Sequence, residues 1–293
     1  MSFLSYFLSG LSLGSIYAII ALGYTMVYGI AKMLNFAHGD IIMVGAYMIF
    51  IFMNQLGINT FLAIILSGIF CTILGMVIEK VAYKPLRNAT PLSVLITAIG
   101  VSYLLQNLAL LIFGANTKAF TSVIALKPLS LFDGKLIISA ESIITILICI
   151  IIMVILTLFI NKTKNGQAMI AVSEDKSAAT LMGINVNKTI SITFAIGSFL
   201  AAIAGALLCS AYPSLTPTTG AMPGIKAFVA AVIGGIGSIP GAFIGGLVLG
   251  ILENLSKAYI SSQLSDAIVF SLLIIVLLVK PTGILGKNQN EKV

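Results

Sequence analysis

Residues 142–161 read SIITILICIIIMVILTLFIN and carry no Asp, Glu, Lys or Arg. An α-helix of about 20 residues is about 30 Å long, which is the thickness of the hydrocarbon core of a bilayer. This stretch therefore predicts a membrane-crossing helix. Five further runs are equally free of these charged residues: 1–31, 41–78, 88–117, 189–225 and 227–252. Together they predict an all-α polytopic integral membrane protein.

The composition agrees with that fold class. Of the 293 residues 59% are hydrophobic and 9% are charged, whereas soluble domains carry roughly 25% charged residues. The net charge of +7 does not indicate nucleic-acid binding, because the lysines lie between apolar runs and form no basic stripe. Cys71, Cys149 and Cys209 all lie inside apolar segments, which indicates packing residues rather than metal ligands or a disulfide framework. We expect no metal and no bound cofactor.

Polar residues divide the longest run. As one helix, residues 41–78 would be about 57 Å long, nearly twice the hydrocarbon thickness, and NQLGIN at 54–59 supplies a polar turn. With a Gly-rich segment at 227–252, we expect about eight transmembrane segments in one transmembrane domain, 1–293. The other expected spans are 1–31, 41–53, 60–78, 91–113, 142–161, 189–209 and 267–279.

The Gly-rich segment 227–252 is interrupted by GGIGSIPG at 234–241. Proline removes a backbone donor and glycine weakens helix continuity, so the pattern predicts a broken or re-entrant segment whose half-helices meet near the bilayer middle. Irregular backbone at membrane depth marks transport sites. Candidate residues of the path or gate are therefore Gly235, Gly237, Ser238 and Pro240. The alternative is one kinked helix whose glycines serve close packing.

Basic residues indicate the orientation, since cytoplasmic loops carry more Lys and Arg. If the broken segment enters and leaves by one face, alternating crossings place eleven basic residues on one side and five on the other; a straight crossing gives eight on each. The eleven are Lys32, Lys80, Lys84, Arg87, Lys162, Lys164, Lys176, Lys188, Lys280, Lys287 and Lys292, and the five are Lys118, Lys127, Lys135, Lys226 and Lys257. We expect the richer side, with the C-terminus, to be cytoplasmic.

Two features of the sequence bear on whether this chain catalyses a reaction or relays protons, and both argue against it. Gly10-Leu11-Ser12-Leu13-Gly14 matches the G-x-S-x-G pattern of hydrolases, but it lies in an apolar helix and His38 is the only histidine. Packing glycines explain the match, and we expect no catalytic residue. The apolar spans as delimited above also contain no Asp, Glu, Lys, Arg or His, which disfavours a proton relay.

Polar residues concentrate at two other places. Residues 35–40, NFAHGD, form a polar cluster next to apolar spans. Asn35, His38 and Asp40 either line the path or close a gate, or they form a structural turn in which His38 and Asp40 bond locally.

The second place is 162–188, the longest polar interlude. Met169, Val172, Ala179 and Met182 recur near helical spacing while residues 174–176 are polar, which predicts one short amphipathic surface helix. The alternative is a solvated connector.

Taken together, these stretches resemble a known family, the H-type permease subunit of branched-chain amino-acid ABC importers, over nearly the whole chain. The resemblance is carried by GLSLGSIYA at 10–18, ALGYTMVYGI at 21–30, NFAHGD at 35–40, AATLMGIN at 178–185 and KAFVAAVIGGIGSIPGA at 226–242.

The resemblance implies a non-catalytic pore subunit that moves Leu, Ile and Val inward across a bacterial cytoplasmic (inner) membrane. It implies a second homologous permease subunit, two cytoplasmic ATP-binding subunits that hydrolyse ATP, and an extracytoplasmic substrate-binding protein as partners. Besides these proteins, the partner is the lipid bilayer, and no nucleic acid is expected.

The resemblance also assigns a role to 162–188, because permeases of ABC importers carry a cytoplasmic E-A-A-x-x-x-G segment that docks on the ATPase. This chain keeps Ala178, Ala179 and Gly183 but has Ser177 in place of the Glu. Glu174 or Asp175 could substitute one turn earlier. The alternative function is a passive channel or facilitator for small polar solutes such as urea or amides; a channel has no ATPase to dock, so the coupling segment discriminates between the two.

Overall fold

The computed structural model describes residues 2–87, 89–124, 126, 128–131 and 136–286. These residues form a helical bundle with four short strands, which confirms the predicted fold class. The helices are α1 (Ser2–Ala31), α2 (His38–Phe50), α3 (Thr60–Ile78), α4 (Pro91–Phe113), α5 (Ala140–Lys162), α6 (Lys164–Glu174), α7 (Lys176–Leu181), α8 (Val186–Ala211), α9 (Ala221–Gly234), α10 (Ile239–Tyr259) and α11 (Ser265–Val279).

Shorter elements extend the helices or join them. Two π-helical turns, η1 (Ile51–Gln55) and η2 (Glu79–Tyr83), follow α2 and α3, and a 3₁₀ turn, η3 (Lys84–Leu86), follows η2. Strand β1 (Lys118–Ala119) pairs antiparallel with β4 (Ser214–Leu215), and β2 (Leu129–Leu131) pairs antiparallel with β3 (Leu136–Ile138).

Six of the described helices are long and apolar enough to cross a membrane: α1, α3 with its π and 3₁₀ extensions, α4, α5, α8 and α10. The shorter α9 and α11 are also apolar. This set differs from the predicted one: it leaves out α2, which covers most of the expected span 41–53, and it counts α9 and α10 separately where 227–252 was expected as one segment.

Side-chain caps explain where several helices begin. The side chains of Thr90, Ser139, Asn185 and Ser238 each accept a hydrogen bond from a backbone N–H in the first turn of α4, α5, α8 and α10. Such caps satisfy donors that have no partner within the helix. Proline stands in the first turn of α4 and of α10, where its missing N–H costs nothing.

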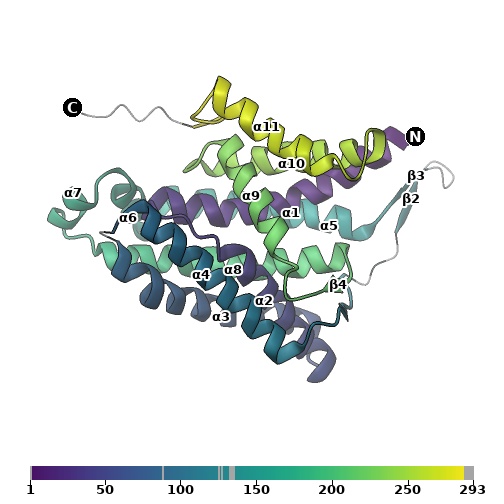
Figure 1. Cartoon of the computed structure of the whole chain (residues 1–293), viewed down its shortest axis with the longest axis horizontal. Coiled ribbons are helices and arrows are strands. Elements are labelled where there is room, and N and C mark those ends of the chain that lie inside the picture. The colour runs from purple at the N-terminus through teal and green to yellow at the C-terminus, as the bar shows by residue number, and fades with distance from the viewer. Residues whose placement is uncertain (1, 88, 125, 127, 132–135, 287–293) are drawn as a thin grey trace.

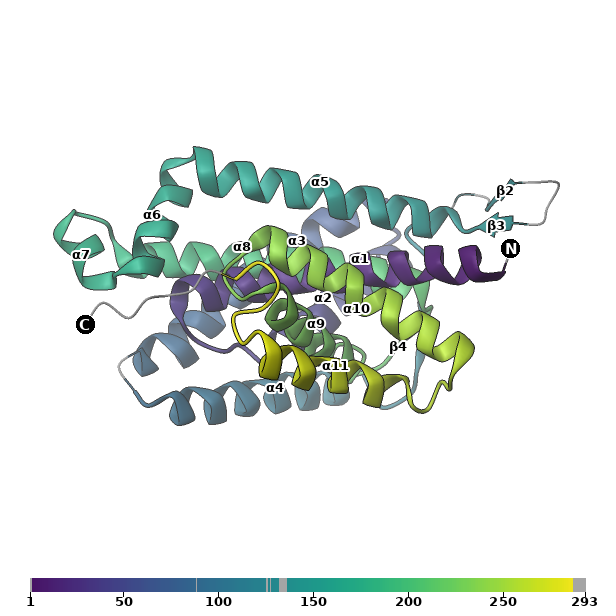
Figure 2. The same cartoon turned by 90° about the horizontal axis from the view of Figure 1, so that it is seen from above.

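Helix α1 is the centre of the bundle and packs against α5, α8, α9 and α10 (Figures 1 and 2). Helix α4 lies at one side, against α2 and η2, and exposes large apolar side chains along its length. Helices α3, α5 and α11 also expose apolar side chains. Lipid tails are as apolar as these side chains, so such faces suit contact with lipid or with another membrane subunit.

The break predicted in 227–252 is present. Helix α9 ends at Gly234, α10 begins at Ile239, and the turn between them holds Gly235 and Gly237 at φ 106° and 90°. Gly241 approaches Gly234, and Gly245 approaches Ala230, so α9 and α10 form an antiparallel hairpin whose outer ends share a side. The count of eleven basic residues against five assumed this geometry, in which segment 227–252 enters and leaves by one face.

The position of the break differs from the prediction. The turn lies beside Gly29, two residues before α1 ends, and not at the middle of the bundle. The C-terminal segment packs there as well, since the N–H groups of Ile284 and Leu285 donate to the carbonyls of Ile233 and Gly234. These bonds satisfy carbonyls at the end of α9, which is why the helix can stop inside the protein.

The bundle has two distinct ends. Helices α6 and α7 and the C-terminal segment lie at one end, and the N-terminus and the β2–β3 hairpin lie at the other (Figure 2). Lys176 and the end of α1 meet at the α7 end, where Arg87 also bonds Asn187. Lys127, Lys135, Lys287 and Lys292 of the orientation count lie outside the described residues. Lys226 does not lie in a loop, as the count assumed, but in α9.

Candidate translocation and coupling sites

Two helices begin inside the bundle at one place, which we call the α2–α9 junction: Gly39 in α2, and Gly220 with Gly224 at the start of α9. A Cβ atom on Gly220 would lie 1.8 Å from the carbonyl oxygen of Gly39, and one on Gly224 would lie 2.8 Å from the Cα of Gly39. Only glycine permits this approach of the two backbones. The junction lies next to Tyr24 of α1, since the Tyr24 hydroxyl is 3.8 Å from a Cβ built on Gly224.

The predicted path residues Asn35, His38 and Asp40 are all buried at the start of α2. The Asn35 Oδ1 accepts a hydrogen bond of 2.8 Å from the hydroxyl of Tyr83, and the Asp40 carboxylate accepts one of 2.8 Å from the amide of Gln106. Asn35 and Asp40 therefore tie the α1–α2 connection to η2 and α4, where a purely local turn was the alternative. The structure does not bring them together with Gly235, Gly237, Ser238 and Pro240, which form the hairpin turn at the end of α1.

Aromatic rings surround the junction. The His38 ring meets that of Tyr24 edge to face at a centroid distance of 4.7 Å, and Phe228 of α9 lies 5.9 Å from Tyr24 and 5.7 Å from Phe36. Phe36 and Phe228 are half-buried. An apolar aromatic surface thus adjoins the buried polar residues of α2.

A buried ion network was not predicted. The Lys226 ammonium of α9 lies 2.8 Å from the Glu253 carboxylate of α10 and 2.7 Å from the Asp266 carboxylate of α11. Glu253 also accepts hydrogen bonds from Lys257, at 2.5 Å, and from the hydroxyl of Tyr17, at 2.9 Å. Four helices, α1, α9, α10 and α11, therefore meet at one group of charges.

The spans as delimited from the sequence hold no Asp, Glu, Lys, Arg or His, but α9 and α10 extend beyond the run 227–252 and include Lys226 and Glu253. Lys226 and Glu253 bracket the uncharged run 227–252, and at the level of sequence each reads as a loop residue. The hairpin folds the run back on itself and brings its two ends together inside α9 and α10. Opposite charges at the two ends of a Gly/Pro-interrupted apolar run were the signal for this pair.

A second polar cluster lies at the α7 end of the bundle. Glu79, buried in η2, pairs with Arg87 and accepts a hydrogen bond of 2.7 Å from Ser191 of α8. Arg87 also donates to Asn187. This cluster holds the end of α3 against the start of α8.

The polar interlude 162–188 contains two helices, α6 and α7, where one was predicted. The helix is interrupted at Asp175, whose backbone is extended (φ −153°). Its carboxylate accepts hydrogen bonds from the N–H groups of Ser177 at 2.7 Å and Ala178 at 3.0 Å. An aspartate that caps the following helix cannot continue the preceding one. Glu174 is exposed at the end of α6.

The buried face of this segment is confirmed at Met169, Val172 and Ala179, but Met182 is 82% exposed. The reason is Gly183, whose φ of 82° ends α7. The N–H groups of Gly183 and Ile184 donate to the carbonyls of Thr180 and Ala179, which is the Schellman pattern of a helix end. Met182 therefore belongs to the turn and not to the helix face.

Helix α7 lies at one end of the molecule (Figure 1), and its tip exposes apolar side chains. Leu181 is 89% exposed and Met182 82%, next to exposed Ser177 and Ala178. We call these four residues, with Gly183, the coupling tip. Exposed apolar side chains on an otherwise polar segment indicate a protein contact.

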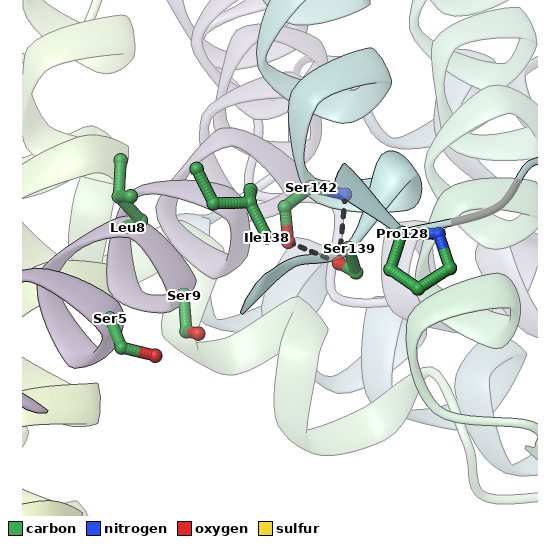
Figure 3. Close-up of a pocket in the computed structure, with 7 residues that line it drawn as sticks. All are labelled: Ser5, Leu8, Ser9, Pro128, Ile138, Ser139 and Ser142. Atoms are coloured by element: carbon green, nitrogen blue, oxygen red, sulfur yellow. Dashed lines mark hydrogen bonds between the residues drawn. The ribbon is translucent and has the colours of Figure 1, made fainter. Parts of the chain in front are cut away.

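A hollow of about 210 Å³ lies at the opposite end of the molecule. Figure 3 shows the residues that line it. The polar groups that line it are the hydroxyls of Ser5, Ser9, Ser139 and Ser142, and Ser139 caps α5 through the N–H of Ser142. Among the described residues, its lining contains no charged side chain and no member of either polar cluster.

The fold defines a polytopic α-helical membrane protein. A family model described as "Branched-chain amino acid transport system / permease component" matches residues 6–277. The chain belongs to this family. It is 45% identical to the high-affinity branched-chain amino acid transport system permease protein LivH of Salmonella typhimurium, in an alignment that covers 99% of this chain and 98% of that protein.

Two further relatives support the assignment. The permease protein BraD of Pseudomonas aeruginosa is 42% identical over 99% of this chain and 98% of its own. A probable branched-chain amino acid transport permease LivH of Methanocaldococcus jannaschii is 31% identical over 93% of this chain and 89% of its own.

Proposed function

We propose that this chain is a translocation subunit of an ABC importer that moves Leu, Ile and Val into the cytoplasm. Its partners in this proposal are a second homologous permease, two ATPases and an extracytoplasmic binding protein. Relatives that match over nearly their full length are named as high-affinity branched-chain amino acid permeases, which supports the substrate class. A single copy that exposes apolar faces on α3, α4, α5 and α11 suits assembly with a second permease in lipid.

The coupling tip is the observation that carries the ATPase assignment. It presents Leu181 and Met182 at the end of the bundle where the basic residues gather, which is the cytoplasmic end in this proposal. The C-terminal segment at the same end is then cytoplasmic as well. Of the two acidic residues proposed to act in coupling, Asp175 serves as the cap of α7 and Glu174 is free to face the ATPase.

The translocation path in this proposal passes the α2–α9 junction. Asn35, His38 and Asp40 brace the start of α2, while Phe36 and Phe228 offer half-buried rings to an apolar side chain. Gly235, Gly237, Ser238 and Pro240 stand at the cytoplasmic end of the path, where Gly237 and Pro240 are exposed. Broken helices at such a place are typical of transport sites.

Polar substitution of the coupling tip tests the function. We expect L181S combined with M182S to lower leucine uptake at least ~10-fold, because each side chain is more than 80% exposed and contributes to binding rather than to folding. The ATPase should no longer co-purify, while the amount of inserted protein stays normal. The control is K188S, a change at an exposed lysine just beyond the tip.

Normal uptake by the double variant would contradict the ATPase role. The channel alternative is tested in the same preparation: the chain alone, in liposomes, should conduct neither leucine nor urea, whereas a passive facilitator would conduct at least one of them.

The conformation of Gly183 gives a second prediction. G183V places a β-branched residue at φ 82°, a strain of about 1–2 kcal/mol, and should loosen the tip and reduce uptake several-fold. G183N should retain most of the uptake, because asparagine tolerates the left-handed region. Equal uptake by the two variants would show that the backbone of the tip is not important. The measurement is initial uptake rate at matched protein levels.

A further inference from the structure

The side chain of Lys176 connects α7 to a distant part of the chain. Its ammonium donates a hydrogen bond of 3.0 Å to the carbonyl oxygen of Ala31, the last residue of α1. This carbonyl belongs to the last turn of the helix, where carbonyls lack partners and the helix dipole favours a cation. Lys176 thus fastens the first residue of α7 to the end of the central helix.

Two effects disfavour the charged form of the Lys176 ammonium at this position: partial burial and nearby positive charges. Partial burial lowers the pKa of Lys176, and the positive charges of Arg87 and Lys32 lower it further. A lysine with a free choice of rotamer would turn away from two like charges toward water. The contact with α1 therefore defines the position of this side chain.

The Ala31 carbonyl stands at the head of a restrained linker, residues 32–37, between α1 and α2. Lys32 has φ 58°, a left-handed conformation that is strained for a residue other than glycine. Three residues on, Asn35 accepts the hydrogen bond from Tyr83, whose ring packs against Phe194. The linker is thus fixed at its start by α7 and in its middle by η2.

The linker ends at the α2–α9 junction. His38 and Gly39 follow it directly, and Gly39 touches the backbone of Gly220 before α9. A displacement of α7 that shifts Ala31 would act on the start of α2, while Asn35 and Tyr83 supply the fixed point. A route thus runs from α7 to the candidate path: a hydrogen bond joins Lys176 to Ala31, the linker 32–37 continues along the chain, and Gly39 packs against Gly220.

We propose that Lys176 is a positioning residue that transmits movement of the coupling tip to linker 32–37 and so to the α2–α9 junction. This inference rests on the proposed function, because it assigns the movement to a docked ATPase. A purely structural role for Lys176 would make the variant less stable and would not change the leucine moved per ATP hydrolysed.

The test uses the whole transporter, this chain with its permease, ATPase and binding-protein partners, in liposomes with leucine outside. For K176M we expect ATP hydrolysis to continue while leucine uptake per ATP falls about tenfold, because methionine keeps the aliphatic stem but cannot donate to Ala31. K176R should keep at least half of the wild-type ratio. The control is K164M, at an exposed lysine that begins α6.

A double-mutant cycle with N35L tests the route itself. If Lys176 and Asn35 restrain the same linker, the loss in the double variant should be smaller than the product of the two single losses. Independent, multiplicative losses would overturn the route through the linker.

A wild-type ratio in K176M would overturn the role of Lys176. If K176M fails to assemble, K176L, which also lacks a donor, takes its place with the same expected fall in uptake per ATP, and failure of both to assemble would show a structural role and overturn the proposal. The proposed function, docking of the ATPase on the coupling tip, is tested separately. It would be contradicted if the ATPase still co-purified with the L181S/M182S chain.

Discussion

K226M should yield a chain that is several kcal/mol less stable in detergent and inactive in uptake. Glu253 is 1% exposed and has Lys226 as its buried partner. In K226M this carboxylate keeps only the half-exposed Lys257 and the hydroxyl of Tyr17. Removing one member of a buried ion pair costs up to about 3–5 kcal/mol, because the other charge stays desolvated, and charge in a membrane-spanning helix is costly in itself. Thermal unfolding and leucine uptake measure the two effects.

The matched control is K257M. Lys257 bonds the same carboxylate, but its side chain is 38% exposed, and partly exposed ion pairs contribute only about 0–1 kcal/mol. The double variant K226M/E253Q should regain much of the lost stability, since it removes both charges and leaves Tyr17 a neutral partner. If K226M and K257M were equally stable, the network would be no more than a surface feature.

The sequence predicted the helices well because lipid imposes a simple requirement on them. Residues 91–113 were expected as a span and form α4 with the same bounds, and the expected 60–78 is α3. A segment in hydrocarbon must satisfy its own backbone hydrogen bonds, so an apolar run of sufficient length forms an α-helix. The break at GGIGSIPG could be predicted for the same reason, because glycine and proline interrupt an α-helix.

The sites were predicted less completely because they depend on contacts between distant segments. Asn35 and Asp40 were recognised as unusual, but their partners Tyr83 and Gln106 lie 48 and 66 residues away. The proposed coupling segment 162–188 was recognised as a polar interlude and was expected to be one helix, but the capping preference of Asp175 overrode the helical period and divided it in two. Pairing such as Lys226 with Glu253 follows only once the hairpin is known.

Close packing of α1 on α10 gives the second large effect. A Cβ atom on Gly250 would lie 2.1 Å from the backbone nitrogen and 2.2 Å from the Cα of Gly14, and neither atom can move without shifting a helix. G250A should therefore destabilise the chain by about 3 kcal/mol, at the upper end of overpacking costs, and reduce both folded yield and uptake. Thermal unfolding and size-exclusion chromatography in detergent measure these changes.

The control for this prediction is G100A in α4, because a Cβ atom there would meet nothing within 4 Å. Alanine is the better helix former by about 1 kcal/mol, so G100A should leave the unfolding temperature unchanged or raise it, whereas G250A lowers it. The sign of the same chemical change thus depends on whether a second helix stands against the glycine. Equal effects at the two positions would mean that α1 and α10 are not in direct backbone contact, and the central pair of the bundle would have to be placed differently.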